Sequence, residues 1–165
     1  MRTMNCDAAN KLIKQLQADR DALLVNERNN STYSFLSGEA TELPEYKFAE
    51  IQEKLDKYAH DIVTLKHAVN RFNLETELPE IGLTIDAALV RMAFLSQEKF
   101  KLNRMRNAQP KSRITTGRGV SEYTMLNYDL NEVDVKFRSV CDELIAIQQA
   151  LNIANLTKTF EVDIE

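Results

Sequence analysis

A repeated spacing of apolar residues constrains this chain more than any other feature. In residues 48–72 and again in residues 130–154, apolar side chains recur at alternating steps of three and four. A period of about 3.5 residues indicates long helices that pack against one another at shallow angles. The positions are Phe48, Ile51, Leu55, Tyr58, Ile62, Leu65, Val69 and Phe72, then Leu130, Val133, Phe137, Val140, Leu144, Ile147, Leu151 and Ala154.

The two stretches superpose at a shift of 82, which raises the question of an internal duplication. Amphipathic helices align on their apolar stripes whatever their origin, so matches off the stripe carry more information. Two explanations stay open: duplicated hairpins, with pseudo-repeats 1–82 and 83–165, or convergence on one pattern. The further matches are the Asn-x-x-Asn-Leu endings at 70–74 and 152–156, Tyr46 with Tyr128, and, at a shift of 79, Asp7-Ala8-Ala9 with Asp86-Ala87-Ala88.

The predicted fold is mainly α: an antiparallel bundle of four long helices, built as two α-hairpins, with a small β-hairpin. At 165 residues, one helical domain over 1–165 is the expectation. Residues 111–128 indicate the β-hairpin, turning at Gly117-Arg118-Gly119, and the alternating tail 160–164 indicates a strand or extended arm. We expect helices over about 7–29, 44–72, 84–107 and 129–155, with Asp7 and Thr84 as N-caps and Asn73 as a left-handed C-cap.

Composition is that of an ordinary globular protein and excludes several classes. Hydrophobic residues make up 44% and charged residues 28%, and the net charge of −4 does not point to nucleic acid. No run of 18 apolar residues could span a membrane, and the N-terminus lacks the apolar core of a secretion signal. The two cysteines, Cys6 and Cys141, lie far apart in sequence and fit free thiols in a reducing compartment. We therefore expect a cytoplasmic protein.

The residues that usually carry chemistry form no motif. His60 and His67 are two helical turns apart, about 10 Å, which is too far to share one metal ion without outside ligands, and neither follows a Glu-x-x-His pattern. Neither cysteine has a Cys-x-x-Cys partner, and four glycines cannot build a phosphate-cradling loop. The expectation is no catalytic residue, no cofactor and no metal site.

One segment stands out by its charge. Between Lys99 and Ser121 the chain carries basic residues and no acidic one. Guanidinium and ammonium groups suit phosphate, so the segment is a candidate anion-binding or nucleic-acid-binding site. The alternative is that the cations complement the helix dipole and pair with acidic residues, and the absence of an aromatic between Lys101 and Glu122 argues against base stacking. The candidates are Lys99, Lys101, Arg104, Arg106, Lys111, Arg113 and Arg118.

Three segments resemble a known family. They are residues 69–74, 83–89 and 144–157, which include the Asn-Leu endings and Leu83-Thr84-Ile85-Asp86. The pattern resembles the septicolysin-like family of small uncharacterised bacterial helical proteins. The family prefers tryptophan where this chain has Leu156, and it has no assigned activity, so the resemblance implies a bacterial helical protein and no catalytic residue.

The sequence favours a non-enzymatic role: a self-associating helical scaffold, or a protein that binds a partner. A homo-oligomer is expected because the first helix has the poorest apolar stripe. The alternative is a phosphate- or nucleic-acid-binding protein that uses residues 99–118. An enzymatic function, which the sequence favours least, would need a pocket near Tyr46, Tyr128 and the Asn-x-x-Asn-Leu endings. No membrane partner is expected.

Overall fold

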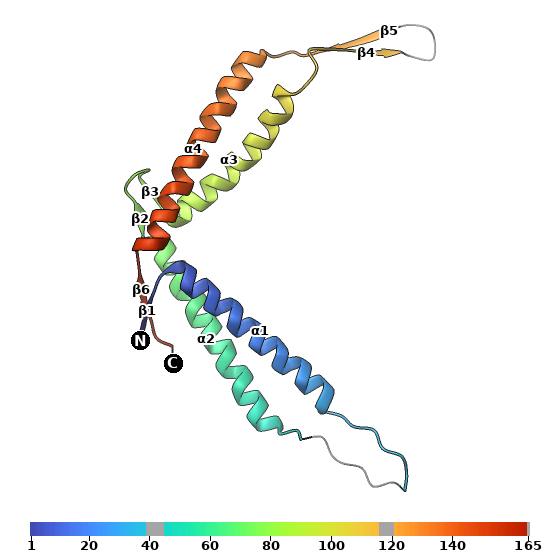
Figure 1. Ribbon diagram of the computed structural model, residues 1–165, viewed down its shortest axis with the longest axis vertical. Helices are drawn as coiled ribbons and strands as arrows, with labels where there is room; N and C mark the ends of the chain where they lie inside the picture. The colour runs from blue at the N-terminus through green and yellow to red at the C-terminus, as the bar shows by residue number, and fades with distance from the viewer. Residues whose placement is uncertain (39–44, 116–120, 165) are drawn as a thin grey trace. The chain divides into compact units, whose positions relative to one another are not determined.

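The computed structural model describes residues 1–38, 45–115 and 121–164, and it confirms a mainly helical chain with small strand pairs (Figure 1). The chain divides into two compact units: unit 1 is Met1–Asn73 with Asn155–Glu165, and unit 2 is Leu74–Ala154. The helices are α1 (Cys6–Asn30), α2 (Phe48–Glu75), α3 (Ile85–Arg106) and α4 (Leu130–Thr157). The strands are β1 (Arg2–Met4), β2 (Glu77–Leu78), β3 (Leu83–Thr84), β4 (Lys111–Thr115), β5 (Ser121–Met125) and β6 (Phe160–Val162).

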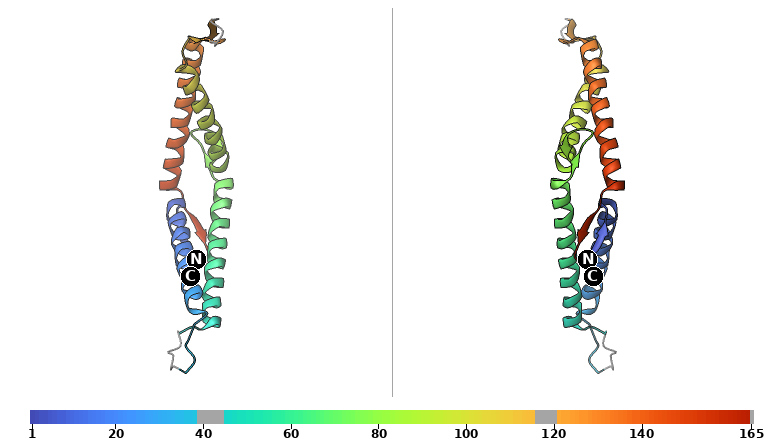
Figure 2. Two further views of the ribbon diagram at one scale, coloured as in Figure 1. Left: turned by 90° about the vertical axis from the view of Figure 1, so that its right-hand side faces the viewer. Right: turned by 90° about the vertical axis from the view of Figure 1, so that its left-hand side faces the viewer.

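Unit 1 is an antiparallel hairpin of α1 and α2, which lie side by side in Figures 1 and 2. Cys6 Sγ, at the start of α1, donates to Asn73 Oδ1 near the end of α2 (3.6 Å). At the other end, Gln52 Nε2 donates to Glu27 Oε1 (2.8 Å), so the two helices run in opposite directions. Their seam encloses a core of Cys6, Ala9, Ile13, Leu65, Val69, Val162 and Ile164. The last two members of this core come from β6 and the residues after it.

Unit 2 repeats this arrangement with α3 and α4. Arg91 Nε lies 2.7 Å from Glu143 Oε1, while Arg106, fifteen residues further along α3, lies 3.3 Å from Asp134, which precedes Glu143 on α4. The partners run in opposite order, so this hairpin is also antiparallel. The buried side chains of both seams are apolar, and among the described residues no polar or charged residue is buried. Whether the four helices form one bundle stays a prediction.

Short antiparallel strand pairs close each unit. β1 pairs with β6, which brings residues near the two ends of the chain together (Figure 1). β2 pairs with β3 across a turn in which Gly82 has a φ of 65°, a backbone conformation that glycine adopts without strain. β4 pairs with β5, which confirms the predicted hairpin, although its Gly-Arg-Gly turn lies outside the described residues. The extended tail is confirmed as β6, whereas β1 was not predicted.

The two units share their caps and their strand registers. The Asn5 side chain accepts the N–H of Ala8 at the start of α1 (2.9 Å), and Thr84 accepts that of Ala87 at the start of α3 (3.2 Å). The strand pairs show the same relation. In unit 1 Met4 lies opposite Phe160, and in unit 2 Leu83 lies opposite Leu78. A shift of 79 relates Met4 to Leu83, and a shift of 82 relates Leu78 to Phe160. These equivalences follow the same shifts as the sequence matches and support the duplication, which stays a prediction.

Two predicted helix ends are wrong. Asn5, and not Asp7, caps α1, because the helix already starts at Cys6 and Asp7 lies in its first turn. Asn73 does not end α2 in a left-handed conformation, since the helix continues to Glu75 and no described residue other than glycine has a positive φ. Thr84 is the N-cap of α3, as predicted.

Candidate functional site

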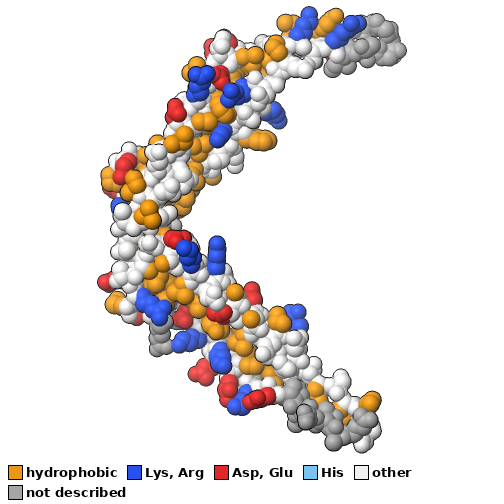
Figure 3. Space-filling model, viewed as in Figure 1, with side chains coloured by type: hydrophobic (Ala, Val, Ile, Leu, Met, Phe, Trp, Pro, Cys, Tyr) orange, Lys and Arg blue, Asp and Glu red, His pale blue; other side chains and the backbone are white. Residues whose placement is uncertain are grey.

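The basic residues singled out from the sequence lie in one part of unit 2, the second half of α3 and β4. Figure 3 shows several Lys and Arg side chains over this part of the unit. Lys99, Lys101, Arg104 and Arg106 belong to α3 and Lys111 and Arg113 to β4, whereas Arg118 lies outside the described residues.

Three of these cations have partners within unit 2. The Arg106 guanidinium is 3.3 Å from Asp134 and stands 4.4 Å from the centroid of the Phe137 ring. Lys111 Nζ stands 4.4 Å from the centroid of the Tyr123 ring. Arg113 Nε donates to Ser121 Oγ (2.9 Å).

Lys101 and Arg104 differ from these three. Both are exposed, and neither side chain has a hydrogen-bond or ion-pair partner within residues 1–38, 45–115 and 121–164. These two cations near the end of α3 are therefore available to an outside anion. The segment therefore contains cations with contacts inside the unit and cations without them, and of the former Arg106 has its charge paired with a carboxylate, whereas Lys111 and Arg113 contact neutral groups.

Tyr123 is a site residue that the sequence did not single out. It lies outside the basic run, but the antiparallel register places it directly opposite Arg113, with Met125 opposite Lys111. Opposite residues of an antiparallel pair share a face. Both Tyr123 (53% exposed) and Met125 (67% exposed) are available to an outside partner. One face of the ribbon thus combines two cations, an aromatic ring and a thioether. The sequence would have revealed this combination only if the strand register had been known.

A groove runs along one flank of the α3–α4 hairpin. It is a shallow depression, open to solvent, with a volume of about 310 Å³. Phe100 follows Ser96 by one helical turn, so its side chain extends the same flank. The flank is mainly apolar, and three of its large side chains stay in water: Leu89 is 42% exposed, Phe100 75% and Ile145 55%. The groove is lined by Met92, Ser96, Lys99, Cys141, Leu144, Ile145 and Gln148.

The other flank of the same hairpin carries two ion pairs. Arg91 pairs with Glu143, and Lys136 Nζ lies 3.6 Å from Glu98. The side-chain hydrogen bonds from Arg91 lower the pKa of Glu143, with partial burial opposing them. Seven residues separate the two partners on each helix, so both pairs lie along one line of the hairpin. The two flanks therefore differ in charge, which suits one to water and the other to an apolar partner.

The histidines and cysteines stand apart from one another. His60 and His67 are both exposed on α2, and the described residues hold no cluster of three or more His, Cys, Asp or Glu side chains suited to a metal ion. Cys6 is buried in unit 1, and this burial raises the pKa of its thiol. Cys141 is half-buried at the wall of the groove.

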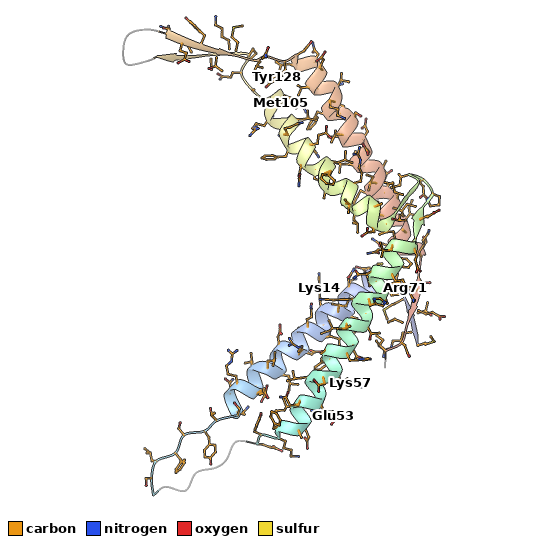
Figure 4. All side chains as sticks on the ribbon, turned by 180° about the vertical axis from the view of Figure 1, so that it is seen from behind. Lys14, Glu53, Lys57, Arg71, Met105 and Tyr128 are labelled. Atoms are coloured by element: carbon orange, nitrogen blue, oxygen red, sulfur yellow. The ribbon has the colours of Figure 1, made fainter. Side chains whose placement is uncertain are left out.

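Tyr46 and Tyr128 each tie a loop to the end of the preceding helix. The Tyr46 hydroxyl donates to Glu27 Oε1 (3.1 Å), and the Tyr128 hydroxyl donates to the main-chain oxygen of Met105 (2.9 Å; Figure 4). Desolvation, followed by the hydrogen bond and the negative charge of Glu27, raises the pKa of Tyr46. These contacts give both tyrosines a structural role.

The comparisons with known proteins establish a fold. No family model matches the chain, and no curated protein matches it. Among solved structures, the crystal structure of a functionally unknown conserved protein from Corynebacterium diphtheriae is similar, with a TM-score of 0.64 and 17% identity over 97% of this chain and 100% of that chain. At this identity the likeness shows the fold alone. Within the described residues, no helix has the length and apolar character needed to cross a membrane.

Proposed function

We propose that this protein is a self-associating helical scaffold or partner-binding protein and not an enzyme. The observation that carries the proposal is the exposure of large apolar side chains on two-helix hairpins. Two helices share only one seam, so their outer faces meet water unless another molecule covers them. In unit 2, Leu89 is 42% exposed, Phe100 75% and Ile145 55%, although all three lie in regular helix.

Size-exclusion chromatography with light scattering at low and high salt tests this function. We expect an oligomer whose mass does not fall as salt is raised, because apolar contacts are not screened. A monomer of 18.9 kDa at micromolar concentration would contradict self-association. An oligomer that dissociates in high salt would mean that ion pairs, and not the apolar faces, hold the assembly.

A second candidate function, binding of a polyanion such as nucleic acid, is favoured by the face of the β4–β5 ribbon. Cross-strand pairing places Tyr123 beside Lys111 and Arg113, so this face offers both cations and a ring for stacking. A two-stranded ribbon also fits the major groove of duplex DNA. The proposal explains why the basic run continues from α3 into the ribbon.

Fluorescence anisotropy with a labelled DNA duplex tests this second function. The variant Lys111→Glu/Arg113→Glu should abolish a strongly salt-dependent binding, because phosphate contacts release counterions. Lys54→Glu/Lys66→Glu makes the same change in net charge on exposed positions of α2 and should leave binding nearly intact. Equal binding by all three proteins would exclude the ribbon as the site.

A further inference from the structure

The two flanks of the α3–α4 hairpin differ in charge, and this difference bears on which surface a partner would cover. One flank carries the pairs Arg91–Glu143 and Glu98–Lys136, whose charges are already satisfied in water. The groove on the other flank has Lys99 as its only charged lining residue in the described part of the chain. Covering the groove flank thus costs little desolvation of charge.

The groove flank is also large enough for a stable interface. α3 has 22 residues, which gives a length of roughly 33 Å at 1.5 Å per residue, and two adjacent helices are about 20 Å wide. The flank therefore offers about 650 Å² per copy, or about 1,300 Å² when two copies meet. Specific interfaces start at about 1,200 Å² in total.

We propose that this flank docks on the same flank of a second copy of the chain, so that two α3–α4 hairpins complete a four-helix arrangement in trans. The inference rests on the proposed self-association and names its surface and its partner. Met92, Leu144 and Ile145 lie at the centre of the contact, and Phe100 extends it along α3. A two-fold interface is self-complementary, so one patch serves both copies.

The charged groups in and beside the groove are compatible with this contact. The methylene stem of Lys99 lines the groove and can stay against apolar surface while its ammonium reaches water. Beyond Lys99, toward the end of α3, Asp134 forms ion pairs with both Arg106 and Arg138. This cluster of two arginines and one aspartate keeps a net charge of +1, so it forms a polar rim that stays in water beside the apolar centre.

Two matched double variants test the assignment, because large apolar side chains are also exposed outside the groove flank. Phe100→Gln/Ile145→Gln alters the groove flank, and Phe94→Gln/Val135→Gln makes the same kind of change away from it. All four side chains are at least 55% exposed, so neither variant removes core packing. Circular dichroism of the wild type and the two variants checks that all three proteins have equal helix content.

Sedimentation velocity over a concentration series then measures the dissociation constant of each protein. The groove variant should dimerise about 100-fold more weakly than the wild type, since it removes two anchors of an interface, and the control should change less than about threefold. As a second readout, maleimide should modify Cys141 more slowly in wild-type dimer than in the groove variant, because Cys141 lines the groove.

The outcomes separate this inference from the proposed function. A wild-type protein that is monomeric at all concentrations overturns both this inference and the proposed self-association. A wild-type oligomer that is unaffected by Phe100→Gln/Ile145→Gln, or affected equally by the control variant, overturns the surface assigned here and leaves self-association standing.

Discussion

The segment that follows α4 should stabilise α1 and α2 and not the hairpin from which it emerges. Val162 and Ile164 are 4% and 8% exposed in a core built with residues of α1 and α2. Replacing both by alanine removes five carbon atoms, which at about 0.8 kcal/mol each gives about 4 kcal/mol before any cavity term. This loss is a large share of the 5–15 kcal/mol that usually stabilises a domain.

Hydrogen exchange followed by mass spectrometry reads the two units separately. In Val162→Ala/Ile164→Ala, the slowest amides of α1 and α2 should exchange about 1,000-fold faster, which is the equivalent of about 4 kcal/mol. Amides of α3 and α4 before Ala154 should change little, because they belong to the other unit.

The intervening residues provide the control for this experiment. Glu161 and Asp163 are exposed on the same segment, so Glu161→Ala/Asp163→Ala should leave the exchange of both units nearly unchanged. Faster exchange in α3 and α4, or no difference between the core variant and this control, would refute the placement of the tail in unit 1.

Three further predictions follow from single contacts. Tyr128→Phe should lower the free energy of unfolding by about 1 kcal/mol, measured by urea titration, because it removes one neutral hydrogen bond to the α3 main chain. Hydrogen bonds from Arg91 lower the pKa of Glu143, so this pair should stabilise the protein above the ordinary carboxyl pKa and lose that effect as the pH falls through the lowered value. The stability difference between wild type and Glu143→Gln should therefore shrink as the pH falls below the ordinary carboxyl pKa, and a constant difference would contradict the prediction. In a Cys141→Ala protein, thiol reagents should modify the buried Cys6 only as fast as unit 1 opens, and modification at the rate of a free thiol would contradict the burial.

The sequence predicted the parts of the fold that depend on local signals. Thr84 was identified as a cap because its hydroxyl can accept a main-chain N–H three residues on, and the structure shows that bond. The β4–β5 hairpin was predicted within residues 111–128 from its β-forming residues around glycines, and both strands lie within that segment. The β1 strand was missed because three residues are too few to show a period, and its partner, β6, comes from the other end of the chain.

The candidate site also depends on tertiary contacts that local sequence signals do not reveal. The basic run is visible in sequence, but charge alone does not tell a free cation from a paired one. Arg106 is held by Asp134 and Phe137 from α4, whereas Arg104, two residues earlier, is exposed and unpaired among the described residues. The two positions differ by half a turn of helix, and only the packing of α3 on α4 decides which one meets a neighbour.

The sequence by itself determined the helical character of this chain, most clearly in residues 48–72 and 130–154, because steps of three and four place one apolar stripe on a helix whatever its neighbours are. Tertiary structure alone decided how much of the apolar content is covered. A hairpin of two helices has a single seam, so Leu95 and Ile147 are buried while Phe94 and Phe100 remain in water. It also decided that residues near the two ends of the chain meet as β1 and β6, because the hydrogen bonds of a strand pair join segments without regard to their distance in sequence.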